Sequence, residues 1–229
     1  MNYYSQSQQD KIVDILFSKK MNGFFVDIGA HNGVNFSNSL FFEKYRDWKG
    51  VCIEPIPEVF EELQKNRNCH LINGVISDSK EILEFKRVHG YGGMLSGILK
   101  YREKLHDERT DSELEKYDGF AEIISIQSYT LKEILDKIGT QKVDYLSLDI
   151  EGGEFEVLQS INFKELDITC LTVENNYNAD EPRKYMKKNG YLLLKIAGHS
   201  DDFYFKKDKV NYLIKWKFAY YKFKNRLIK

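Results

Sequence analysis

Residues 24–33 read FFVDIGAHNG, an apolar run that ends in an acid and leads into two glycines. The run 24–27 predicts a buried strand, and Gly29 and Gly33 let the following backbone turn tightly and approach a ligand closely. Amides at the start of the helix expected next can bind polar ligand groups. The spacing differs from the GxGxxG pattern that cradles a pyrophosphate, so it favours a cofactor without phosphates. A tight turn without a ligand is the alternative.

Short apolar runs alternate with helical patterns along the rest of the chain. The other runs that predict strands of the same sheet are 50–54, 70–73, 143–149, 170–174, 191–196 and 202–206. The segments expected to be helical are 38–45, 58–66, 131–138 and 154–160. Several strands are apolar on both faces, as in a parallel sheet covered by helices on both sides. The alternation therefore predicts a doubly wound α/β sheet.

Two features depart from simple alternation. Only five residues separate 191–196 from 202–206, too few for a parallel crossover, so these two strands are expected to form an antiparallel hairpin. Residues 82–88 and 122–127 read as extra strands around a charged insert, 100–118, which is expected to be helical and exposed. A parallel sheet that ends in such a hairpin resembles the layout of class I S-adenosylmethionine (SAM) methyltransferases.

Charge is unevenly distributed along the 229 residues. Residues 209–229 hold seven of the 34 basic residues and none of the 35 acidic ones, which leaves the rest of the chain with a net charge of −8. An acidic body argues against a nucleic-acid groove, and no apolar stretch approaches the ~18 residues of a membrane span. We expect one domain over 1–208 and a basic aromatic tail over 209–229. The tail suits peripheral contact with an anionic membrane, docking on the body, or a homodimer.

Two further strand ends carry polar residues that suit a nucleoside. Glu54 and Pro55 lie at the end of the second strand, and an acid there can accept hydrogen bonds from both hydroxyls of a ribose. Ser77 and Asp78 follow the third strand and can bind the exocyclic amine of an adenine, although both residues also favour turns for local reasons. A surface carboxylate is the alternative for Glu54.

Five segments, taken in order, resemble the FkbM family of SAM-dependent O-methyltransferases: 25–33, 53–55, 76–78, 148–152 and 198–201. The likeness covers roughly residues 5–206. It implies a Rossmann-like class I fold with a mostly parallel seven-stranded sheet, SAM as donor, and a hydroxyl as acceptor, often on a sugar. The expected cofactor-binding residues are Asp27, Gly29, Ala30, His31, Asn32, Gly33, Glu54, Pro55, Ser77 and Asp78.

The catalytic candidates lie at the carboxyl ends of later strands, where ligands of doubly wound sheets bind. They are Asp149, Glu151, Glu174 and His199. The acids suit orientation of sugar hydroxyls, or binding of Mg²⁺ as a further option, because hard oxygen ligands suit that ion. Glu151 can instead stabilise the start of the following helix. The general base stays open between His199, His31 and a carboxylate such as Asp149.

The sequence thus predicts a cytoplasmic SAM-dependent O-methyltransferase, with peripheral membrane contact as an option, that acts on a hydroxyl of a sugar in a glycan, glycoconjugate or nucleotide sugar. No nucleic-acid partner is expected. The enzyme alternative is an NAD-dependent sugar oxidoreductase, which would also use Glu54 on a ribose but normally carries GxGxxG. The alternative that is not an enzyme is a SAM-binding or membrane-associated scaffold.

Overall fold

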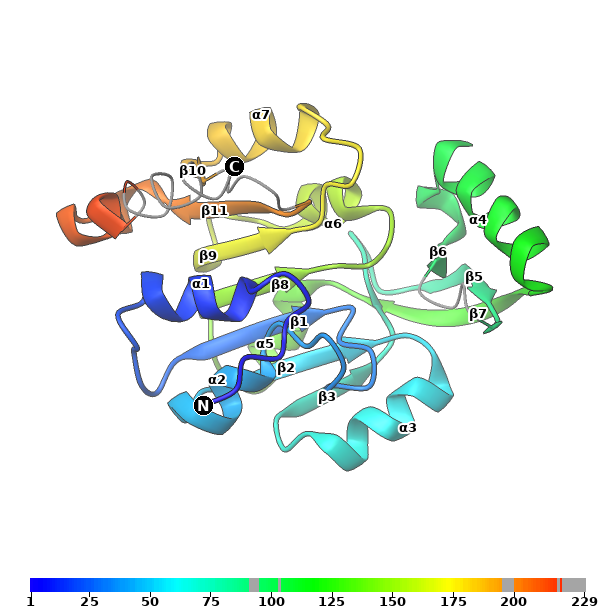
Figure 1. The fold of residues 1–229 in the computed structure, drawn as a ribbon, viewed down its shortest axis with the longest axis horizontal. Helices are drawn as coiled ribbons and strands as arrows, with labels where there is room; N and C mark the ends of the chain where they lie inside the picture. Colours follow the sequence, from blue (N-terminus) through cyan, green and yellow to red (C-terminus); the bar gives the residue numbers. More distant parts are fainter. Residues whose placement is uncertain (91–94, 103, 195–199, 218, 220–229) are drawn as a thin grey trace.

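The computed structural model describes residues 1–90, 95–102, 104–194, 200–217 and 219. Its α-helices are α1 (Gln9–Leu16), α2 (Leu40–Arg46), α3 (Pro57–Asn66), α4 (Lys104–Tyr117), α5 (Leu131–Ile138), α6 (Glu154–Ser160) and α7 (Glu181–Lys188). Its strands are β1 (Phe24–Ile28), β2 (Lys49–Glu54), β3 (His70–Asn73), β4 (Val75–Ile76), β5 (Ile82–Val88), β6 (Gly97–Ile98), β7 (Ala121–Tyr129), β8 (Lys142–Leu148), β9 (Asp167–Val173), β10 (Tyr191–Leu194) and β11 (Asp202–Lys206). Figure 1 shows their arrangement.

Seven of the described strands form the main sheet, in the order β10-β11-β9-β8-β1-β2-β3. β1 lies between β2 and β8 and pairs with both in parallel, so the chain order reverses beside β1. β11 runs antiparallel to both β9 and β10. The predicted doubly wound sheet with a terminal hairpin is therefore confirmed. The reversed strand lies inside the sheet, however, and β10 forms the edge, because β11 pairs with β9 directly.

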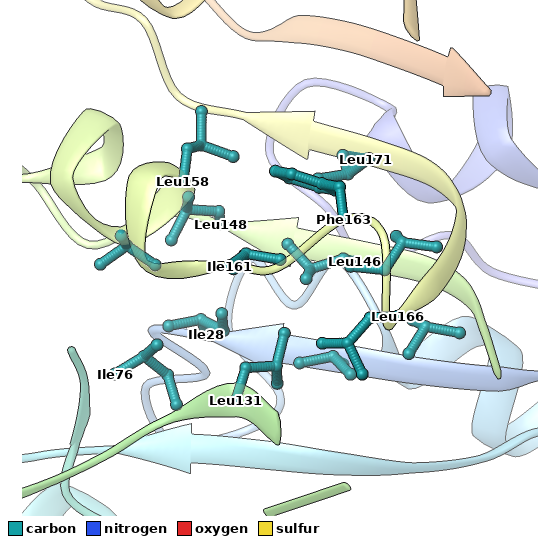
Figure 2. Packing of buried hydrophobic residues seen from close by; sticks show 14 of the residues in the cluster. Ile28, Ile76, Leu131, Leu146, Leu148, Leu158, Ile161, Phe163, Leu166 and Leu171 are labelled. Carbon is teal, nitrogen blue, oxygen red and sulfur yellow. The ribbon is translucent and has the colours of Figure 1, made fainter. Parts of the chain in front are cut away.

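Helices cover both faces of this sheet. α1, α2 and α3 contribute to one buried cluster, in which Val13, Phe42 and Leu63 pack with Phe25 of β1. α5, α6 and α7 contribute to the other cluster, part of which Figure 2 shows around Leu146. Each fully buried large apolar side chain stabilises the fold by about 1.5–3 kcal/mol relative to exposure. The two clusters hold the carboxyl ends of β1, β2 and β8 in fixed positions.

Local signals explain several of the helix ends. Pro57 opens α3 at a position where its missing N–H costs nothing. Thr130 and Glu133 form a reciprocal capping box at the start of α5, and Gly139 ends that helix in the left-handed region. α2 begins at Leu40, two residues later than expected, and α1 and α7 are not among the helices that the sequence predicts.

The expected extra strands form a sheet of their own. β5 and β7 pair antiparallel over their length, and with β4 and β6 they make a second sheet in the order β4-β7-β5-β6. α4 supplies the expected helix of the insert, and its described side chains are mostly exposed. Figure 1 shows this sheet and α4 at the right of the view, at the end of the main sheet toward which β1 and β8 point. The insert therefore lies where a ligand of the main sheet would bind.

The described part of the basic tail contacts the body. Ile214 is buried in the same cluster as α1, and the Lys217 Nζ donates to the carbonyl oxygen of Ile15. Tyr212, Leu213 and Trp216 are between 59% and 79% exposed, so the aromatic side of this segment faces outward. Among the described residues, no helix combines the length and the apolar character that crossing a membrane requires.

Candidate active site

A cavity opens at the carboxyl ends of β1, β2 and β8. It contains about 1160 Å³ of space, its open mouth included. Gly29 forms one wall with φ +86°, and a Cβ there would collide with the carbonyl oxygen of Asp149. The Gly29 and Ala30 amides both donate to the Ile53 carbonyl oxygen, at 3.0 and 3.1 Å. Glycine is therefore needed where β1 ends, because the turn passes directly beside the end of β8.

Glu54 lines the cavity at the end of β2. It is 5% exposed, and its two carboxylate oxygens accept from the backbone amides of His31 (3.0 Å) and Ile56 (2.9 Å). Burial raises the pKa of Glu54 to about 7, although the two amides act in the opposite direction. The carboxylate is thus held by two turns and retains lone pairs for a hydroxyl-bearing ligand.

Asp27 and Asn38 line the inner end of the cavity. The Ser39 hydroxyl donates to Asp27 Oδ2 at 2.5 Å, and burial raises the pKa of Asp27. Asn38 donates through Nδ2 to the Ser147 hydroxyl, while its Oδ1 is buried and has no hydrogen-bond partner among the described residues. A buried acceptor without a partner costs about 1–3 kcal/mol, which a ligand that donates a hydrogen bond would recover.

Arg67 supports the loop between β1 and α2. Its guanidinium is fully buried and forms an ion pair with Glu43 at 2.7 Å. The same group donates to the carbonyl oxygen of Gly33 (3.2 Å) and to the hydroxyl of Ser39 (3.0 Å). Arg67 is a positioning residue that the sequence analysis did not identify, because its partners lie between 24 and 34 residues away in the chain.

The apolar wall of the cavity comes partly from the second sheet. Its members are Ile53, Ile56, Val75, Ile76, Phe85 and Ile98. Ser77 and Asp78, expected to bind an adenine amine, do not belong to the lining, and the side chain of Asp78 is 70% exposed. Asn32 also lies outside the lining, where its side chain accepts from the amides of Val34 and Asn35.

Three carboxyl groups meet where β8 and β9 end. One oxygen from each of Asp149, Glu151 and Glu174 lies within 4.8 Å of the others. Burial first, and then the neighbouring acids, raise the pKa of Asp149 well above its ordinary value and that of Glu174 to about 10. Burial also raises the pKa of Glu151, while Arg109 lowers it. The three groups therefore cannot all be ionised at neutral pH unless a cation lies beside them.

The turn after β8 is tightly constrained. Glu151 adopts φ 56°, an uncommon conformation for a residue other than glycine, and Gly152 and Gly153 follow with φ 122° and 93°. Glu154 accepts from the amides of Gly152 (2.9 Å) and Ile150 (3.3 Å), and so it secures this turn at the start of α6. Glu154 thus plays a structural role, whereas Glu151 projects toward the other acids.

A second hollow adjoins the first and shares Glu151 and Gly152 with it. It contains about 670 Å³ of space, its mouth included. β9 contributes the end of the strand and its loop, including Glu174 and Tyr177, and the insert contributes Tyr101 and Arg109. The acid cluster therefore lies at the junction between two hollows, an arrangement that suits a reaction between two bound molecules.

Most predicted site residues converge on this region. The cavity is lined by Asp27, Gly29, Ala30, His31, Glu54, Pro55, Asp149 and Glu151, and the second hollow by Glu151 and Glu174. Gly33 is buried behind the loop, where it accepts from Arg67. His199 lies outside the described residues, so its role as a base stays a prediction. No local sequence signal points to Asn38 or to the wall that β5 and β6 provide.

Comparison with known sequences identifies the family. The sequence model for the methyltransferase FkbM domain matches residues 27–193, nearly three quarters of the chain, from the carboxyl end of β1 into β10. The chain belongs to the FkbM methyltransferase family.

A curated relative agrees with this assignment. The chain is 26% identical over 161 residues to the methyltransferase sdnD of Sordaria araneosa, and the match covers 62% of this chain and 61% of that relative. The chain thus matches less than two thirds of the relative's length.

Solved structures match the chain at low identity and with TM-scores below 0.5. The precorrin-6y C5,15-methyltransferase of Geobacter metallireducens has a TM-score of 0.45 and 12% identity, with 88% of this chain and 89% of that chain covered. A methyltransferase of Pyrococcus furiosus has a TM-score of 0.42 and 13% identity, with 90% and 88% covered. The class I assignment rests on the observed strand order and on the family match.

Proposed function

We propose that this FkbM-family chain transfers the methyl group of SAM to a hydroxyl, most simply one on a sugar. The observation that carries the proposal is the cavity at the switch point of the sheet, which is lined by Glu54 and by two members of the acid cluster, Asp149 and Glu151. SAM supplies an electrophilic methyl group on a sulfonium. The protein must hold that group in place, orient the acceptor oxygen and take up its proton.

The residues present fit this cofactor. Glu54 would accept from the two ribose hydroxyls, and the apolar wall from Ile56 to Ile98 suits an adenine ring. Asn38 Oδ1, which finds no partner in the described part of the chain, and the buried Asp27 would accept from the ammonium of the methionine portion. This assignment gives a physical reason for the unsatisfied acceptor.

Charge favours SAM over NAD. Among the described lining residues, four are acidic (Asp27, Glu54, Asp149 and Glu151) and His31 is the one basic residue. A pyrophosphate would bring negative charge beside these acids, whereas a sulfonium and an ammonium bring positive charge. The absence of GxGxxG points the same way.

Asp149 is the carboxylate that we assign to proton uptake. It lines the cavity and belongs to the cluster that borders the second hollow, and its raised pKa makes its ionised form a stronger base. Glu151 and Glu174 would hold the acceptor's hydroxyls or its proton. His199 stays a rival for the base, and Mg²⁺ on the same three acids stays a rival for their role.

The proposal is tested by binding and by transfer. Calorimetry with SAM, its demethylated product S-adenosylhomocysteine and NAD should show heat for the first two alone; NAD binding without SAM binding would overturn the assignment. Transfer of labelled methyl to a panel of sugars, glycans and nucleotide sugars, with and without EDTA, then identifies the acceptor. Asp149→Asn should keep S-adenosylhomocysteine affinity within about threefold and lower transfer by about 10²–10⁴-fold. Full transfer by that variant would remove Asp149 from the role of base.

A further inference from the structure

The second hollow has a composition of its own. Its described lining residues are Tyr101, Arg109, Glu151, Gly152, Gly153, Glu154, Phe155, Glu156, Glu174, Asn175, Asn176, Tyr177, Ala179 and Pro182. The cofactor proposal leaves this hollow free, and its shared rim with the cavity places it within reach of the transferred group.

The charge of the hollow is strongly one-sided. Four of its described lining residues are glutamates, and Arg109 is the single cation among them. Glu154 is used by its own turn, which leaves Glu151 and Glu174 as the enclosed carboxyls near the junction. An anionic acceptor placed here would meet two acids at short range, whereas a cationic acceptor would be attracted by them.

Arg109 marks where such a cation would lie. Its Nη1 is 3.4 Å from Glu151 Oε2, a loose contact, and its side chain is 44% exposed while that of Glu151 is 15% exposed. Arg109 comes from α4, whose other described residues are largely exposed, so the side chain can move outward without disturbing a core. A cation of the acceptor could therefore replace the guanidinium beside Glu151.

Aromatic side chains complete the site. Tyr101, Phe155 and Tyr177 line the hollow, and Tyr177 is 50% exposed. Ring faces of this kind pack against the apolar face of a sugar and attract ammonium groups. Tyr101 is held in place by a hydrogen bond of 2.8 Å between its hydroxyl and that of Ser77.

We propose that the second hollow is the acceptor site and that it selects an amino sugar, whose protonated amine displaces Arg109 from Glu151 and lies between Glu151 and Glu174. This inference rests on the proposed function and goes further by assigning a positive charge to the acceptor. It predicts opposite effects of two substitutions. Arg109→Ala removes the competing cation, and Glu174→Gln removes a carboxylate that recognises the amine.

The test uses three monosaccharides that share a pyranose ring: glucosamine, N-acetylglucosamine and glucuronic acid. Each is titrated by ligand-observed NMR into the full chain saturated with S-adenosylhomocysteine. Glucosamine should bind at least about tenfold more tightly than the other two, equivalent to about 1.4 kcal/mol. Arg109→Ala should tighten glucosamine binding by about threefold or more, and Glu174→Gln should weaken it by about tenfold. Arg87→Ala removes an arginine outside both hollows and should leave all three affinities unchanged.

Several results would overturn the inference. Equal or tighter binding of N-acetylglucosamine or glucuronic acid refutes selection for an amine, and so does weaker glucosamine binding by Arg109→Ala. A preference that shifts to glucuronic acid when Mg²⁺ is added would show that the glutamates hold a metal instead. Failure of all three sugars to bind, with S-adenosylhomocysteine bound, refutes the acceptor inference but leaves the proposed function standing. No binding of S-adenosylhomocysteine overturns both.

Discussion

Replacement of Glu54 by glutamine should weaken cofactor binding selectively. The carboxylate lies at the end of β2, is 5% exposed and accepts from the amides of His31 and Ile56. Glutamine has nearly the same shape but carries no charge, and its NH₂ group must face one of those two amides. The variant therefore loses the ionised acceptor for the ribose and one hydrogen bond of the turn.

The expected magnitude follows from the change in hydrogen-bond type. A bond to a charged group contributes about 1.5–3 kcal/mol and one between neutral groups about 0.5–1.5 kcal/mol. For two ribose hydroxyls the difference is about 2–3 kcal/mol, which corresponds to about 30- to 150-fold in Kd. Since the pKa of Glu54 is about 7, the comparison belongs at pH 8.5, where the carboxylate is ionised.

Calorimetric titration with S-adenosylhomocysteine measures this effect. Wild-type affinity should fall by roughly tenfold between pH 8 and pH 6 as Glu54 takes up a proton, whereas the affinity of Glu54→Gln should not follow that trend. Glu61→Gln, an exposed glutamate on α3, is the matched control and should bind like the wild type. A folded Glu54→Gln variant whose Kd stays within threefold of wild type at pH 8.5 would refute the role of Glu54 on the ribose.

Three other predictions concern the turn, the acid cluster and the tail. Gly29→Ala should destabilise the chain more than Gly139→Ala in urea unfolding. Both positions have positive φ, but of the two only a Cβ at Gly29 would meet a backbone carbonyl. Equal losses in the free energy of unfolding would contradict that reason. The free energy of unfolding without ligand should fall as pH rises from about 5 to 8.5. The pKa values of Glu54 (about 7) and Glu174 (about 10) in the folded chain lie above the ordinary value of 4.5. In this pH range the folded chain therefore binds more protons than the unfolded chain, and a rise in pH destabilises it. Glu174→Gln should make the free energy of unfolding depend less on pH. A wild-type chain that is more stable at pH 8.5 than at pH 5 would contradict the raised pKa values of the buried acids. Finally, Trp216→Glu should reduce sedimentation with anionic vesicles and leave binding to neutral vesicles unchanged. If the wild-type chain binds neither kind of vesicle but forms a dimer, and Trp216→Glu is a monomer, the result would favour the homodimer.

The sequence alone determined the main sheet and the outline of the cavity at the ends of β1, β2 and β8. Runs that are apolar on both faces become the strands of a doubly wound sheet, because each face must pack against helices. The glycine turn after residue 28 and the acid at residue 54 follow from chain-local signals, and both reach the cavity because parallel strands bring their carboxyl ends together. Asp149 and Glu174 meet for the same reason, since β8 and β9 pair in parallel.

Only the tertiary structure decided how the site is enclosed and balanced. Three features of the site depend on contacts between segments far apart in the chain, and no local period or spacing encodes them. They are the hydrogen bonds of Arg67, the unsatisfied oxygen of Asn38 and the apolar wall around Phe85. The separate second sheet and the position of β11 between β9 and β10 likewise depend on which strand edges meet. Local pattern specifies which face of an element is buried, whereas burial, charge and hollows at a site arise from the packing of all its elements at once.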